Sequence, residues 1–199
     1  MNTALLPRTT EWRWKYKVHI FRHLHTVNKH RRAVRRLCFK AGLYKRGLLH
    51  DLSKYSPSEF IPGAKYYQGD KSPQVAERKA LGYSAAWLHH KGRNKHHFEY
   101  WRDVNDSGNI CVKMPAVYFG EMICDRVAAC KIYLKDKYTD RSALDYFLRR
   151  TDVRNLHEET AADLKYFLEM LAADGEKKTF SALKKFIKEQ KKKEKSPSS

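Results

Sequence analysis

The chain has 199 residues, of which 42% are hydrophobic and 13% aromatic, and this apolar content excludes a wholly disordered protein. Its 41 Lys and Arg residues outnumber 22 Asp and Glu residues, and the net charge of +19 favours anionic partners such as nucleotides or nucleic acid. No segment approaches the ~18 apolar residues of a membrane span, and the N-terminus lacks the apolar core of a signal peptide. We therefore expect a cytoplasmic protein without a membrane partner.

The first fifty residues contain 13 basic residues and 1 acidic residue, so the positive charge is concentrated there. The segment Trp12–Ala41 has no Pro or Gly, which predicts one long helix that stops at Gly42. A short leucine-rich helix over Leu48–Leu52 follows, and we expect it to carry His50 and Asp51.

Ser56 and Pro57 form a typical helix start, with Ser56 as the N-cap and Glu59 in the first turn. Residues 74–101 are compatible with one long helix, with a kink or break near 91–93.

The second half of the chain also indicates helices. Their expected ranges are Pro115 to about Asp136, a short helix around Leu144–Phe147, Asn155 to about Ala173 with a stop at Gly175, and a last helix from Thr179.

Only residues 109–112 suggest an extended segment. The sequence therefore predicts an all-α fold, a bundle of seven or eight helices. We expect residues 1–138 to form a metal-binding helical domain, 139–190 to pack on it as C-terminal helices, and 191–199 to be a basic disordered tail.

The first candidate site is the sequence His50-Asp51-Leu52-Ser53-Lys54. An imidazole and a carboxylate together suit a divalent metal, and adjacent residues of a helix reach one ion only beyond its end or between helices. Lys54 would share a helical face with His50, which favours an anionic group between them. The alternative is a surface histidine beside an aspartate near a helix cap.

Four histidines fall within nine residues: His89, His90, His96 and His97. In an unbroken helix His90, Asn94 and His97 share one face, an arrangement that suits a metal or a phosphate group. The alternative is a polar surface helix with incidental histidines.

The third candidate pair is Glu121 and Asp125, four residues apart in the helix expected after Pro115. Like charges at this spacing disfavour a free helix, so a shared cation or separate partners would explain them. The alternative is that both carboxylates face water.

The order His … His-Asp … Asp in a helical context resembles the HD-domain superfamily of metal-dependent phosphohydrolases. HDLSK resembles the HDxxK form of its motif, and the later histidines resemble those of multinuclear members such as the HD-GYP proteins, although the GYP-type substrate loop is absent. The strings HDLSKYSPSEF, NKHHFEYW and MPAVYFGEMICD are similar to a small bacterial and phage family without an assigned function, over about residues 28–130.

This resemblance implies seven metal ligands: His30, His50, Asp51, His90, His96, His97 and Asp125. His23 is the alternative to His30, and His89 is the alternative to His90.

The resemblance also implies a phosphohydrolase that acts on a nucleotide or related phosphate ester, with one or two divalent ions (Mn, Fe, Co, Ni, Zn or Mg). Asp51 would act through the metal, and Lys54, Arg93 and Asn94 would hold phosphate. Glu121 would serve in acid–base chemistry or orient a ligand histidine.

Two other functions stay open from the sequence. A nucleic-acid-binding protein that keeps the metal site only structurally would explain the charge, the cluster Arg31–Arg36 and the alternating aromatic and basic residues of Trp12–Lys17. A metal-stabilised structural protein without catalysis is the other.

Overall fold

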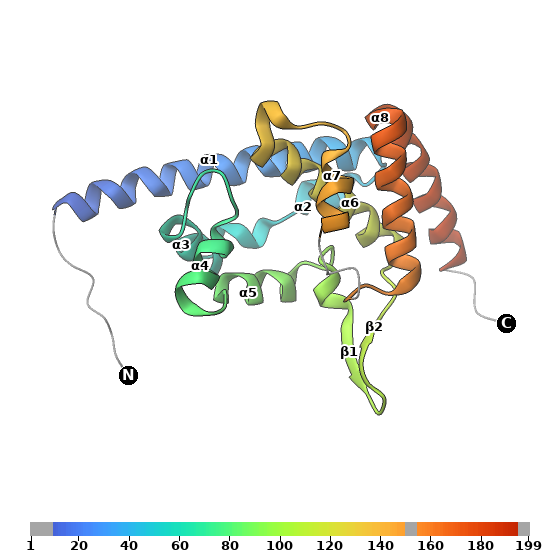
Figure 1. Cartoon of the computed structure of the whole chain (residues 1–199), viewed down its shortest axis with the longest axis horizontal. Helices are drawn as coiled ribbons and strands as arrows, with labels where there is room; N and C mark the ends of the chain where they lie inside the picture. The colour runs from blue at the N-terminus through green and yellow to red at the C-terminus, as the bar shows by residue number, and fades with distance from the viewer. Residues whose placement is uncertain (1–9, 150–154, 195–199) are drawn as a thin grey trace.

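The computed structural model of the protein describes residues 10–149 and 155–194, with side chains from residue 19 onward. Within these ranges the regular structure is helical apart from one short hairpin, which confirms the all-α prediction (Figure 1). The eight α-helices there are α1 (Thr10–Lys40), α2 (Tyr44–Leu49), α3 (Pro57–Lys65), α4 (Pro73–Leu81), α5 (Ala85–Arg93), α6 (Ala116–Leu134), α7 (Ser142–Arg149) and α8 (Glu158–Lys193). The remaining elements are the 3-10 turns η1 (Leu52–Tyr55), η2 (Phe98–Trp101) and η3 (Lys135–Lys137) and the strands β1 (Arg102–Asn105) and β2 (Gly108–Cys111).

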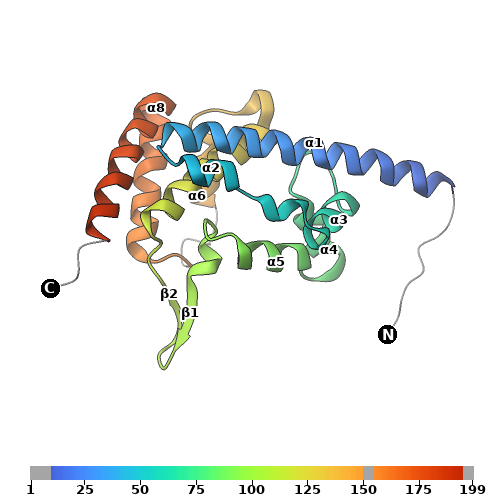
Figure 2. The same ribbon diagram turned by 180° about the vertical axis from the view of Figure 1, so that it is seen from behind.

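Helix α1 runs along one side of the molecule and ends just before Gly42, as the sequence predicts (Figure 2). Gly42 has a φ of 74°, a conformation that glycine adopts without steric cost. The buried side chains Val27 and Val34 lie seven residues apart on one face of α1, and the helix packs on α6. The side chains of Trp12–Lys17 lie outside the described part.

The hydrophobic core lies between α1, α6, α7 and α8. Its fully buried members include Val34, Cys38, Cys124, Val127, Ala143, Leu164, Leu168 and Leu183. One cluster therefore joins side chains from both of the predicted segments, 1–138 and 139–190. None of the helices in the described ranges combines the length and apolar character that crossing a membrane requires.

Helix α8 consists of two arms that lie side by side in opposite directions (Figure 1). The chain reverses at Gly175, whose φ of 76° and ψ of 176° are not helical, so the predicted stop at this glycine is confirmed. The second arm begins directly after Gly175, earlier than the predicted start at Thr179. It reaches Lys193, which corrects the start of the predicted tail, and residues 195–199 lie outside the described part.

Residues 74–101 do not form one long helix, because the chain breaks twice there. The break after Arg93 lies where the sequence predicted a kink or break, whereas the break at Gly82 was not predicted. Gly82, with a φ of 80°, ends α4, and the Ser84 hydroxyl accepts a hydrogen bond from the Trp87 amide at 3.0 Å to begin α5. At the other end, Asn94 is the C-cap of α5, and its side chain donates to the His90 carbonyl at 2.8 Å. The histidines of this segment consequently lie on a helix and on the loop that follows it.

The strands β1 and β2 form an antiparallel hairpin that projects from the helical body (Figure 1). Its register pairs Arg102 with Cys111 and Asn105 with Gly108. The predicted extended segment 109–112 overlaps β2. The sequence did not indicate β1, in which Val104 is the only residue that favours a strand.

Candidate metal centre

Asp51 lies at a sharp break between α2 and η1, which corrects the prediction of a helix through His50 and Asp51. Its φ of 53° places it in the left-handed region, which aspartate tolerates better than most residues. Arg31 of α1 stabilises this break, because its Nε donates to the His50 carbonyl at 2.7 Å and its Nη2 donates to the Leu48 carbonyl at 3.1 Å. Its Nη1 donates to the Tyr55 hydroxyl at 2.9 Å.

A first set of donors surrounds one oxygen of Asp51. Oδ2 lies 3.8 Å from Nε2 of His30 and 3.3 Å from Nε2 of His50. Asp125 of α6 completes the set, because its Oδ1 is 2.9 Å from the same nitrogen of His30 and 3.7 Å from that of His50. One donor atom from each of these four residues fits within 4.8 Å of the others, so the set can hold a metal ion.

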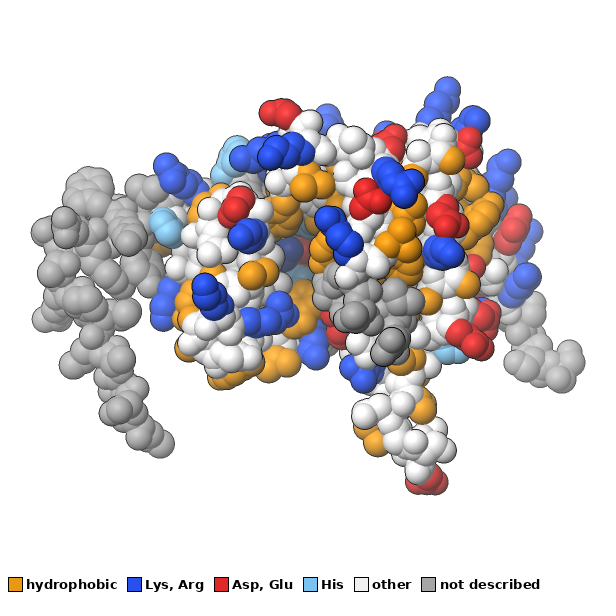
Figure 3. All heavy atoms as spheres, viewed as in Figure 1, with side chains coloured by type: hydrophobic (Ala, Val, Ile, Leu, Met, Phe, Trp, Pro, Cys, Tyr) orange, Lys and Arg blue, Asp and Glu red, His pale blue; other side chains and the backbone are white. Residues whose placement is uncertain are grey.

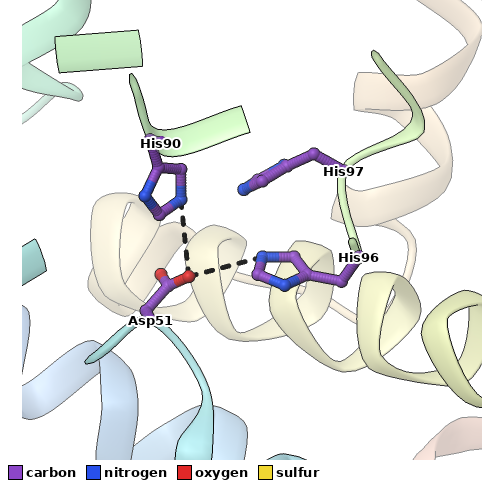
Figure 4. Close-up of side chains that lie close together, drawn as sticks. All are labelled: Asp51, His90, His96 and His97. Atoms are coloured by element: carbon purple, nitrogen blue, oxygen red, sulfur yellow. Dashed lines mark ion pairs between the residues drawn. The ribbon is translucent and has the colours of Figure 1, made fainter. Parts of the chain in front are cut away.

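A second set of donors surrounds the other oxygen of Asp51. Oδ1 lies 3.4 Å from Nε2 of His90 and 3.4 Å from Nε2 of His96 (Figure 4). His97 points into the same space, and its ring centroid is 4.1 Å from that of His96 and 4.8 Å from that of His90. These four residues form another group with the spacing of a metal site. Asp51 is thus common to both sets.

The donor atoms of the two sets are spaced as ligands of a metal ion rather than as hydrogen-bond partners of one another. Two atoms bound to one ion at about 2.1 Å lie roughly 3.0–3.5 Å apart. Three of the six separations above fall in this range, and the other three lie between 2.9 and 3.8 Å. Buried polar atoms normally have hydrogen-bond partners. The buried side-chain atoms without a hydrogen bond of regular geometry in the described part of the chain include Nε2 of His30, His50, His96 and His97 and both oxygens of Asp51.

Carboxylates behind the histidines hold their rings. Glu121 of α6 is fully buried, and its Oε1 pairs with Nδ1 of His50 at 2.9 Å. The other oxygen of Glu121 accepts from Nε of Arg46 at 2.5 Å. Glu59 of α3 pairs in the same way with Nδ1 of His90 at 2.6 Å. A carboxylate on the far nitrogen fixes the orientation and tautomer of a ligand histidine, so Nε2 of both rings is directed at the metal space.

Burial and neighbouring charged groups determine the protonation states of the donor side chains. Burial alone would raise the pKa of Asp51, but the charges of His50 and Lys54 hold it well below its usual range. Asp125 is partly buried, with 20% of its side chain exposed. Burial would raise its pKa, but the contact with Nε2 of His30 at 2.9 Å and the charge of His50 keep this pKa well below the usual value. Burial lowers the pKa of His30 and of His97, which therefore offer neutral nitrogens.

His50 is the exception among the histidines. Burial would lower its pKa, but the charge of Asp51 and the hydrogen bonds to Asp51 and Glu121 raise it to about 10. Lys54 also forms an ion pair with Asp51, in which Nζ lies 2.7 Å from Oδ2. Asp51 lies between these two cations, so the sequence expectation of an anionic group beside Lys54 agrees with the geometry. A metal ion at Nε2 of His50 would displace the proton from that nitrogen.

Five residues of the two sets, His30, His90, His96, His97 and Asp125, line a cavity of about 560 Å³, whereas the fully buried His50 and Asp51 are not among its lining residues. The space-filling view shows a hollow in the middle of this face, with histidine at its floor and Lys and Arg side chains around it (Figure 3). The aromatic side chains that line it are Tyr67, Trp87, Phe98, Tyr133 and Tyr146, and the cations are Lys54, Lys71, Arg78, Arg126 and Arg149. Five carboxylates also line the cavity: Glu59, Asp70, Glu77, Glu99 and Asp125. An anionic group could therefore bind only beside the Lys and Arg side chains or a metal ion, with a flat apolar part against the aromatic rings.

Of the sequence-predicted ligands, the structure brings all seven together and decides between the alternatives. His89 pairs through Nδ1 with Glu59 at 2.7 Å, outside both donor sets, so His90 is the inward histidine. His23 packs on Phe60 and Tyr67, with ring centroids 5.2 and 6.0 Å away, and it belongs to neither set.

The two other residues expected to hold phosphate lie elsewhere, which corrects that part of the prediction. Arg93 is exposed at the end of α5 and is not among the described residues that line the cavity. Asn94 is buried and donates to Ser53 at 2.8 Å besides capping α5. Asn94 was expected on a face of an unbroken helix, which the structure ends at Arg93.

Sequence reasoning missed Arg31, Arg46 and Glu59 as supports of the donor sets and Arg78, Arg126 and Arg149 as cavity cations. Glu59 had a local explanation, because an acidic residue in the first turn is typical of a helix start. The arginines are separated in sequence from the motif residues and carry no spacing signal. Only the tertiary arrangement shows their roles.

A model of a family of unknown function (DUF5662) matches residues 19–170, a span that contains both donor sets. Comparisons with curated proteins and with solved structures found no match.

Proposed function

The chain belongs to this family of unknown function, and we propose that it is a metal-dependent phosphohydrolase acting on a nucleotide or a related phosphate ester. The observation that carries the proposal is the position of Asp51, whose two oxygens each face a separate set of metal donors. Donors of both sets line a cavity that also presents five Lys and Arg side chains. The resemblance of the motif His … His-Asp … Asp to the HD-domain superfamily supports the same reaction class.

In this proposal His30, His50 and Asp125 would hold one divalent ion, and Asp51 would be a ligand available to this ion and to a second one. His90, His96 and His97 complete the second position. When bound, such ions lower the pKa of a water molecule and neutralise charge on phosphoryl oxygens. The mixed imidazole and carboxylate donors suit Mn, Fe, Co, Ni or Zn better than Mg, which prefers oxygen ligands.

Cationic side chains bind the phosphate group and orient it toward Asp51. Lys54 is nearest, because its Nζ is already 2.7 Å from Oδ2 of Asp51. Arg126 follows Asp125 on α6 and also lines the cavity. A guanidinium suits phosphate through paired hydrogen bonds. Trp87, which also lines the cavity, offers an aromatic face to a nucleobase.

Glu121 acts as an orienting residue in this proposal. Its side chain is fully buried, and its two oxygens already pair with His50 and Arg46. Burial would raise its pKa, but the hydrogen bonds from His50 and His96 lower it to about 2, so it holds no proton to donate at neutral pH. This geometry favours the second of the two roles predicted for Glu121.

The test is a substrate screen with protein purified without a histidine tag. After loading with Mn or Co, the protein should release phosphate or pyrophosphate from at least one member of a panel of nucleotides and simple phosphate esters. Asp51→Ala should lose this activity, and the matched control Asp106→Ala, at the exposed tip of the hairpin, should keep it. An Asp51→Ala protein as active as the wild type would contradict the proposal.

A metal-loaded protein that hydrolyses nothing in the panel, and melts at a much lower temperature after chelation, would instead favour a structural metal site.

A further inference from the structure

The outward face of α1 carries a row of basic side chains. The row consists of six exposed residues: Arg22, His25, Lys29, Arg32, Arg36 and Lys40. At 100° per residue these positions fall within an arc of about 80°, and they extend over about 27 Å of the helix. The buried residues His23, Val27, His30 and Val34 occupy the opposite face, so the row points away from the metal centre.

This row has almost no acidic partners. Residues 12–50 contain no Asp or Glu, so none comes from α1 beyond Glu11 or from α2. Within the described part of the chain, Lys40 alone among the six forms an ion pair, with Glu176 of α8. Cations gathered without counter-charges repel one another, and an external polyanion relieves that repulsion.

A groove between α1 and α2 extends the basic surface. It has a volume of about 200 Å³, and the residues that line it include Asn28, Arg31, Arg32 and Arg35. Arg31 is engaged with backbone carbonyls, while Arg32 and Arg35 are exposed beside it. The groove thus offers guanidinium groups close together, a combination that suits a phosphate group.

We propose that this face of α1, the row together with the groove, binds nucleic acid through its phosphodiester backbone, independently of base sequence. A straight row of cations matches a polymer that carries one phosphate per ~3.4 Å of each strand. The site lies apart from the cavity and does not depend on the hydrolase proposal.

An anionic membrane would be attracted by the same charge, but the apolar side chains do not favour it. A helix that lies in a membrane surface needs a continuous apolar face. Phe21 and Phe39 are 68% and 39% exposed beside the row, but they stand at its two ends. The face between them is basic, which favours a nucleic-acid backbone over a bilayer.

The experiment measures binding of the full-length protein to a fluorescent DNA duplex of about 20 base pairs and arbitrary sequence, by anisotropy at several salt concentrations. The test variant is the triple substitution Lys29→Gln, Arg32→Gln and Arg36→Gln. The matched control removes three exposed lysines from the second arm of α8: Lys177→Gln, Lys185→Gln and Lys188→Gln. Thermal melting shows that both variants are folded.

The wild type should bind with a steep salt dependence. The α1 variant should lose about 100-fold in affinity at 0.1 M salt, and the slope of log K against log salt should fall by about 2 to 3, whereas the control should stay near the wild type. Equal losses in the two variants, an unchanged α1 variant, or no binding to the duplex would overturn the proposal. Binding to vesicles of anionic lipid without binding to the duplex would also overturn it.

Discussion

Arg31 donates from Nε to the His50 carbonyl at 2.7 Å, which connects α1 to the turn that carries the shared aspartate. The contact matters because Asp51 has a φ of 53° and its backbone alone does not favour that turn. Helix α1 also supplies His30. Through these two residues one rigid helix both provides a ligand and fixes the place of two others.

Replacing Arg31 with Lys should weaken metal binding. Lysine keeps the charge but cannot reach the Leu48 and His50 carbonyls with a planar fork, so the turn is no longer held. We expect metal affinity to fall by about 10- to 100-fold, measured by competition with a chromogenic chelator. Arg32→Lys, next to it and exposed, is the control and should bind metal like the wild type. Equal metal affinity in Arg31→Lys and the wild type would show that the turn at Asp51 keeps its conformation without the Arg31 hydrogen bonds.

Glu59→Gln should weaken one of the two metal positions and leave the other intact. The amide is nearly the same shape, but it is a poorer acceptor for Nδ1 of His90, the only ligand that Glu59 contacts. A two-site titration with Mn or Co should show one affinity reduced by about 10-fold or more. Glu158→Gln, exposed in the first turn of α8, is the control. A uniform loss at both positions would argue against separate donor sets.

His23 should act as a buried neutral histidine. Burial, with a smaller effect of the Lys54 charge, lowers its pKa to about 4. Because an unfolded histidine titrates near 6.5, the stability linked to His23 is complete above that pH and is lost as the pH falls toward 4.

The metal-free protein, kept in EDTA, should therefore lose stability between pH 7 and pH 4.5 partly through His23. His23→Leu should remove about 2–3 kcal/mol of this loss, measured by urea unfolding at the two pH values. His25→Leu, exposed on the same helix, should leave the pH dependence unchanged. If His23→Leu behaves like His25→Leu, then His23 is charged or solvated in the folded protein.

Arg126→Met should raise KM for the phosphate substrate by about 10- to 100-fold with little change in kcat, because one charged hydrogen bond contributes about 1.5–3 kcal/mol to binding. Arg126 lines the cavity. Arg93→Met is the control, since Arg93 lies exposed outside it. A larger effect of Arg93→Met would restore the assignment made from sequence and contradict the cavity as the substrate site.

The sequence predicted most helices from local patterns, and the resemblance of the motif indicated the residues that the structure gathers into the two donor sets. Helix α1 follows from a segment without Pro or Gly, and the reversal at Gly175 follows from a residue that tolerates positive φ. His50, Asp51 and Asp125 were identified from a motif that is defined by residue types and their order in the sequence. No interatomic distance was needed to recognise it.

The predictions that the structure corrects depend on backbone conformation and on contacts between residues far apart in the sequence. Asp51 adopts a left-handed conformation that its residue type permits but does not require, so the break after α2 could not be seen. Helix α5 ends at Arg93, so Asn94 and His97 do not share the helical face that an unbroken helix would give them. Glu59 reaches His90 across 31 positions of the chain, and no spacing rule covers such a pair.

Metal stoichiometry tests the central claim most directly. Protein without a tag, saturated with Mn at pH 8 and freed of excess ion, should contain about two ions per chain by elemental analysis, and Asp51→Ala should contain none or far less. The folded control Asp106→Ala should match the wild type. A wild-type protein that retains no metal, or an Asp51→Ala protein that retains both ions, would contradict a centre shared through Asp51.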